Sequence, residues 1–178
     1  MRYFFLLLSL ALMPNLTAQD TTARAEWLTK WENSRNYTLE ALDQVPDSSL
    51  AYRPTPGQMS IRQQVQHIAG NVFGLSRRYL SYEPAGFKED ELRQRLAAEA
   101  PDRAALVQLL NDAYDYGAAA INSLPVDGWD APVPNFFAGP KTKRVIVYLL
   151  QDHATHHRAQ LLVYLRLLNL QPPRYRGW

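Results

Sequence analysis

Hydrophobic residues recur every three or four positions along four long segments of the chain, which is the spacing of a one-sided α-helix. The segments cover about residues 21–44, 60–82, 101–124 and 142–168. The second segment has the most regular hydrophobic stripe, formed by Ile61, Val65, Ile68, Val72, Leu75 and Tyr79. Helices of this kind bury their hydrophobic faces against one another, so the pattern predicts an all-α four-helix bundle.

Capping residues mark the ends of these helices. Thr21 or Thr22 is expected to begin the first one, and Ser60 with Gln63 three residues later forms a capping-box pattern at the start of the second. Asn169 suits the end of the last helix. The charged stretch 88–100 predicts a short additional helix on the surface.

The connection before the last helix is long and rich in aromatic residues. Residues 125–141 contain four prolines, two glycines, Trp129, Phe136 and Phe137. A loop of this length and composition is expected to fold against the bundle rather than to act as a spacer. Such loops often cover functional sites, so we expect a long crossover connection that serves as a lid.

The first eighteen residues have the features of a secretory signal peptide. Arg2 precedes a short apolar run, and the small residue Ala18 before Gln19 predicts cleavage after residue 18. We therefore expect a leader, 1–18, followed by a single domain, 19–178, that is exported to the periplasm or secreted and does not remain inserted in a membrane. An uncleaved N-terminal anchor is the alternative.

Composition narrows the possible chemistry. Lysine and arginine total 19 against 17 aspartate and glutamate residues, without a basic run, so we expect no nucleic-acid partner. The chain has no cysteine, which excludes a cysteine nucleophile and a thiolate metal ligand. A tightly bound transition metal would therefore depend on histidine, aspartate or glutamate.

Three of the four histidines lie in the last helical segment. His153 and His157 replace hydrophobic residues in its buried stripe, and residues four apart lie one above the other on a helix. His67 lies on the flank of the second segment, beside Gly70 and Gly74. We expect the three imidazoles to converge on one divalent metal ion, with a water as the fourth ligand. The alternative is that they are hydrogen-bonded core residues.

Three further residues are candidates for positions around this metal. His156 points away from the direction of His153 and is expected at the rim. Gln160 shares the face of His157 and is expected to orient a water or a substrate. Asp152 is a candidate acceptor for a hydrogen bond from a ligand imidazole.

Two motifs carry a resemblance to a known family. The run from Asp152 to Gln160, followed by Tyr164-Leu165-Arg166, and the segment from Ser60 to Ala69 resemble the conserved motifs of the DinB-like (DinB/YfiT) family. The resemblance implies a four-helix bundle in which His67, His153 and His157 bind one divalent ion, usually zinc or nickel, and it implies a homodimer. Ala159 departs from the glycine common in the family, which leaves the ligands unchanged.

The function expected from these observations is hydrolysis of an unidentified small molecule by metal-activated water. The resemblance adds the alternative of a thiol-dependent S-transferase or isomerase that holds the thiolate on the metal. Export makes this alternative weaker, because low-molecular-weight thiols are cytosolic. A non-catalytic envelope protein that binds a metal or ligand is a further alternative.

Overall fold

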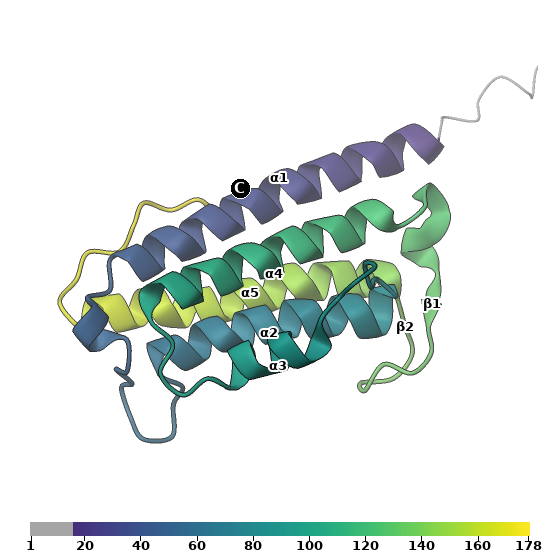
Figure 1. Cartoon of the computed structure of the whole chain (residues 1–178). Coiled ribbons are helices and arrows are strands. Elements are labelled where there is room, and N and C mark those ends of the chain that lie inside the picture. Colours follow the sequence, from purple (N-terminus) through teal and green to yellow (C-terminus); the bar gives the residue numbers. More distant parts are fainter. Residues whose placement is uncertain (1–15) are drawn as a thin grey trace, which may run out of the picture.

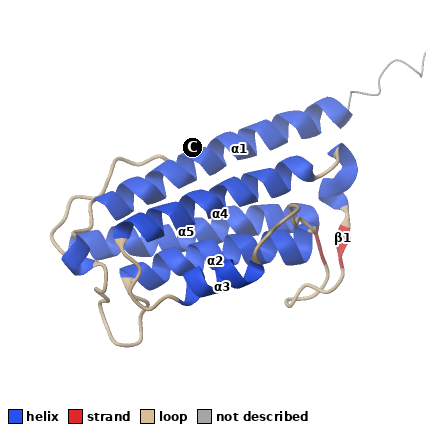
Figure 2. Cartoon of the chain, in the orientation of Figure 1, coloured by secondary structure: helices blue, strands red, loops and turns tan. Residues whose placement is uncertain are grey.

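Four long helices form the body of the protein (Figure 1). The structure, a computed structural model, describes residues 16–178. The long helices are α1 (Leu16–Asp43), α2 (Ile61–Leu80), α4 (Arg103–Ser123) and α5 (Lys143–Leu167), with a short helix, α3 (Glu89–Ala97), lying against α2. The all-α four-helix bundle predicted from the sequence is confirmed (Figure 2).

The helices pack around the bundle in the order α1, α4, α2, α5. Both α1 and α2 pack on α4 and α5, so that α1 and α2 occupy diagonal positions. Polar contacts fix the directions of neighbouring helices. Lys143 at the start of α5 donates to the carbonyl of Leu80 at the end of α2, and Arg103 at the start of α4 donates to Leu42 near the end of α1. These pairs are therefore antiparallel, as Figure 1 shows.

The predicted hydrophobic stripes form the core. All six stripe residues of α2 are buried, and they face an interior that includes Trp31 and Tyr114. The Trp31 indole donates to the Tyr114 carbonyl, and the two rings lie 4.5 Å apart. Gly117 makes this packing possible, because a Cβ atom there would lie 2.9 Å from the Trp31 ring. The close approach of α1 and α4 thus depends on a glycine.

Most helix ends agree with the sequence. The capping box of Ser60 and Gln63 is present at the start of α2, and Asn169 adopts a left-handed conformation with φ 57° after α5. The first helix is already formed at Leu16, the first described residue, so the expected start at Thr21 or Thr22 is wrong. No proline or glycine occurs between these positions to interrupt it. The predicted leader, 1–18, lies almost wholly outside the described residues. No helix among the described residues is long and apolar enough to cross a membrane.

The long crossover before α5 folds against the bundle, as predicted. It contains a short 3₁₀ helix, Val126–Asp130, and two short antiparallel strands, β1 (Pro132–Val133) and β2 (Lys141–Thr142), that the sequence analysis did not anticipate. Phe136 is buried and its ring lies 5.1 Å from that of Tyr79. Tyr79 is twelve residues after His67, about 18 Å along α2. The crossover therefore lies at the end of the bundle remote from the histidines, and none of its residues lines the pocket beside His67. The expectation that it serves as a lid over the site is wrong, because the contact of Phe136 with Tyr79 holds it at the other end of α2.

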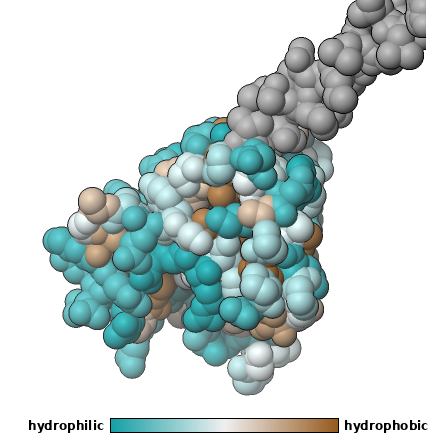
Figure 3. Space-filling view, turned by 90° about the vertical axis from the view of Figure 1, so that its right-hand side faces the viewer, coloured by the Kyte–Doolittle hydropathy of each residue, from teal (hydrophilic) through white to brown (hydrophobic). Residues whose placement is uncertain are grey.

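That end of the bundle presents a mixed surface. Viewed from the side of the crossover, polar residues dominate and hydrophobic residues are scattered among them (Figure 3). Phe137, next to the buried Phe136, is 81% exposed. The aromatic residues of the crossover are thus divided between anchoring the loop and facing solvent.

Candidate metal centre

The antiparallel packing of α2 on α5 brings three histidines together. His67 lies in the second turn of α2, and His153 and His157 lie one turn apart near the middle of α5. Their ligand atoms all lie within 4.8 Å of one another. The Nε2 atoms of His67 and His153 are 3.1 Å apart, and the His157 ring lies 4.4 Å from that of His67 and 4.5 Å from that of His153. The structure therefore groups the three histidines that the sequence predicted as ligands.

This donor set fits a divalent transition-metal ion. Two nitrogen ligands of one tetrahedral zinc ion, each about 2.0–2.1 Å from the metal, lie roughly 3.3 Å from each other. The separation of 3.1 Å between the Nε2 atoms of His67 and His153 is close to this value. Imidazole ligands suit zinc and nickel alike. The ligand atoms of the full set lie within 4.8 Å of one another, so the rings would have to move closer together to hold such an ion.

Burial keeps the three imidazoles neutral. Burial first, and then the charges of the neighbouring histidines, lower the pKa of His153 to about 3 and that of His157 to about 4. The pKa of His67 is also lowered, first by burial and then by the charge of His156. A histidine binds metal through a deprotonated ring nitrogen, so the site has the required protonation state at neutral pH.

Gln64 fixes the orientation of one ligand. Its side-chain oxygen lies 2.6 Å from Nδ1 of His157, and its amide nitrogen donates to Gln160 Oε1 and to the Tyr164 hydroxyl. Because the amide nitrogen faces these two acceptors, the oxygen must accept from His157. His157 then carries its proton on Nδ1 and has a lone pair on Nε2 for a metal.

Gln64 is not among the residues that the sequence predicts for the site. It lies three residues before His67, so the two side chains share one face of α2. This three-residue spacing is the sequence feature from which a place for Gln64 beside His67 could have been predicted. With an exposed fraction of 1%, Gln64 is buried beside the histidines, and its partners satisfy both ends of its amide.

The three other predicted residues differ in their relation to the site. Gln160 does not contact the three histidines directly but accepts a hydrogen bond from Gln64, which contacts His157. The Nε2 atom of Gln160 also lies 2.9 Å from Nε2 of His156. His156 is exposed at the rim, with its ring 4.9 Å from that of His157. Asp152 is exposed, and in the described part of the chain no hydrogen bond or ion pair joins it to the three histidines. In the described part of the chain, the Nδ1 atom of His153 is buried and has no hydrogen-bond partner.

A pocket of about 520 Å³ opens beside His67. Met59, Gln63, Gln66, Gly70, Asn71 and Leu96 form the rest of its lining. The lining includes Gly70, which the helical spacing placed beside His67. None of the lining residues carries a formal charge. A small molecule therefore has access to the His67 side of the candidate metal centre.

Comparison with known proteins gives one sequence match and several structural ones. A sequence model of the DinB superfamily matches residues 30–161, which include all three histidines. No curated protein matches the sequence.

The structural matches share the fold at low sequence identity. A DinB-like protein from Bacillus cereus is 20% identical, with a TM-score of 0.66 over 84% of this chain and 95% of that one. A DinB-like protein from Bacillus subtilis is 18% identical, with a TM-score of 0.65 over 86% and 99% of the two chains. A conserved protein from Enterococcus faecalis is 15% identical, with a TM-score of 0.68 over 84% and 96%.

Proposed function

The chain belongs to the DinB superfamily, and on this premise we propose that it is a divalent-metal-dependent enzyme that acts on a small molecule. His67, His153 and His157 are the proposed ligands, and zinc or nickel is the proposed ion. The observation that carries the proposal is the convergence of three neutral imidazoles, one of which forms part of the wall of an open pocket.

The number of protein ligands favours catalysis over a purely structural role. Structural zinc sites usually have four protein ligands, whereas catalytic sites have three and an open position. When bound, a divalent ion would supply Lewis acidity, which activates water and polarises a carbonyl group. Hydrolysis of an ester, amide or lactone is the reaction class that we propose.

The surrounding residues have distinct roles in this proposal. Gln64 holds His157 in the tautomer that leaves Nε2 free for the metal. His156 is the proposed proton-transfer residue, because it is exposed to solvent and its ring lies 4.9 Å from that of His157. Met59 and Leu96 line the pocket with hydrophobic surface and limit the access of water to the bound substrate.

The proposal is tested with the metal-loaded protein and a panel of uncharged esters, amides and lactones. We expect turnover that chelation abolishes and added zinc restores. The variant His156→Gln should keep its metal and lose most of the turnover. A fully loaded protein that hydrolyses none of the panel would contradict the hydrolytic function. Spectral changes of the cobalt-substituted protein on addition of a thiol would then indicate thiol-dependent chemistry.

A further inference from the structure

The pocket beside His67 continues along α2. A second hollow, of about 370 Å³, shares Gly70 and Leu96 with the first and extends to Arg77. Both hollows lie between α2 and α3. We call their combined space the α2–α3 groove, bounded by residues 66–77 of α2 and 89–97 of α3. One end of the groove is thus at the candidate metal centre.

Two glycines keep this groove open. Gly70 and Gly74 are one helical turn apart and face the same side of α2. A Cβ atom at Gly74 would meet nothing within 4 Å, and one at Gly70 would meet only Leu96, at 3.5 Å. Each glycine within a helix costs about 1 kcal/mol relative to alanine. Neither glycine is required by the packing of the helices, so the space that they leave is available to a ligand.

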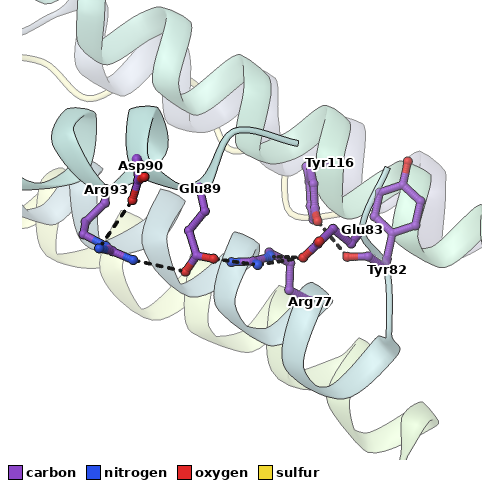
Figure 4. A network of polar contacts seen from close by, with 7 residues as sticks. All are labelled: Arg77, Tyr82, Glu83, Glu89, Asp90, Arg93 and Tyr116. Carbon is purple, nitrogen blue, oxygen red and sulfur yellow. Dashed lines mark hydrogen bonds and ion pairs between the residues drawn. The ribbon is translucent and has the colours of Figure 1, made fainter. Parts of the chain in front are cut away.

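The distant half of the groove is hydrophobic and ends at paired charges. Phe73, Leu92 and Leu96 contribute hydrophobic surface. Arg77 at the end forms ion pairs with Glu83 and Glu89, as Figure 4 shows.

The other arginine at this end is also paired. Arg93 contacts Glu89 and Asp90 (Figure 4). The five charged side chains of this cluster comprise two arginines and three carboxylates. Arg77, Glu89 and Arg93 line this end of the groove, and both arginines are paired with carboxylates, so this end favours an uncharged ligand over an anionic one.

The end near the histidines has an unmet hydrogen-bonding capacity. Asn71 lines the first hollow, and its Oδ1 atom is buried and accepts no hydrogen bond in the described structure. A buried acceptor without a donor costs about 1–3 kcal/mol. Rotation of the Asn71 side chain toward the pocket would bring this acceptor to an N–H or O–H group of a bound ligand.

We propose that the α2–α3 groove binds the hydrophobic chain of an uncharged acyl substrate. The polar head, with an N–H or O–H donor for Asn71, lies at the three histidines, and the alkyl or aryl chain lies over Gly70 and Gly74. This inference rests on the proposed function, because it requires an open position on the bound metal. It adds the substrate class, a neutral amide or ester with a hydrophobic chain.

Alkyl hydroxamic acids test this proposal, because they are uncharged near neutral pH and bind divalent metals through the head group. Acetohydroxamic, hexanohydroxamic and octanohydroxamic acid are titrated calorimetrically into the zinc-loaded protein. We expect affinity to rise with chain length by up to about fourfold for each buried methylene group. In Gly74→Leu, affinity should no longer rise with chain length, while zinc content and acetohydroxamic acid binding remain unchanged. Gly57→Leu is the matched control, because Gly57 also has open space around it and lies outside the groove.

The possible outcomes distinguish failure of the groove proposal from failure of the proposed metal centre. If acetohydroxamic acid binds and the longer acids bind no more tightly, the groove proposal is overturned and the proposed function is unaffected. If Gly74→Leu retains the wild-type dependence on chain length, the chain binds elsewhere and the proposal is likewise overturned. If acetohydroxamic acid fails to bind the zinc-loaded protein, the open position is absent and both proposals fail.

Discussion

Gln64 Oε1 and His157 Nδ1 lie 2.6 Å apart across the interface of α2 and α5. This contact joins the helix that carries His67 to the helix that carries the other two ligands. It also determines which nitrogen of His157 is free to bind a metal. The side-chain amide of Gln64 thus contributes both to the packing of α2 on α5 and to the tautomer of a proposed metal ligand.

The first prediction concerns this amide. In Gln64→Leu the oxygen that holds His157 is lost, and we expect zinc affinity to fall by about 10- to 100-fold. Competition with a chromophoric chelator measures the affinity. Gln64→Glu keeps an acceptor for His157 and should retain more affinity than Gln64→Leu. Gln108→Leu, on the exposed surface of α4, is the control and should bind zinc as the wild type does. Wild-type affinity in Gln64→Leu would show that the contact has no role in metal binding.

The second prediction concerns pH. Burial lowers the pKa of His153 to about 3 and of His157 to about 4, from a usual value near 6.5. As pH falls below 6.5, the unfolded chain takes up protons before the folded one, so the metal-free protein should lose stability between roughly pH 6.5 and pH 3. Urea denaturation at several pH values measures this loss.

The double variant His153→Leu/His157→Leu is the reference for that experiment. It removes both groups, so its stability should depend less on pH in the same interval. Identical pH dependence of the wild type and the double variant would contradict the prediction. Zinc should also be released over this interval, because protons compete for the same ring nitrogens.

The third prediction compares two helical glycines. Gly117→Ala places a Cβ atom 2.9 Å from Trp31 and 3.1 Å from Val72, so we expect a loss of about 1–3 kcal/mol in the free energy of unfolding. Gly74→Ala adds the same atom where nothing lies within 4 Å, and we expect a gain of up to about 1 kcal/mol from helix propensity. Equilibrium unfolding in urea measures both. The same sign for the two variants would contradict the packing described for α1 and α4.

The fold was predictable because its signals are local. The stripe from Ile61 to Tyr79 has helical spacing, and every member of it is buried. The histidines were predictable for the same reason, since His153 and His157 interrupt a stripe that should be hydrophobic. Their convergence with His67, which the family resemblance implied, also required the antiparallel placement of α2 and α5 that the structure shows.

Features that depend on long-range packing were not predictable. The position of the crossover loop follows from the contact of Phe136 with Tyr79, which no local pattern encodes. Gln64 was missed because a glutamine beside a hydrophobic stripe resembles a surface residue. Only the burial of its amide among His157, Gln160 and Tyr164 shows its role.

The metal content of the purified protein tests the central claim most directly. The wild type and the variants His67→Ala, His153→Ala and His157→Ala are measured by mass spectrometry, with His156→Ala as the matched control. We expect about one zinc or nickel ion per chain in the wild type and in His156→Ala, and almost none in the other three variants. A metal-free wild type whose melting temperature does not change with added zinc or nickel would contradict the account and would leave a helical bundle with buried histidines.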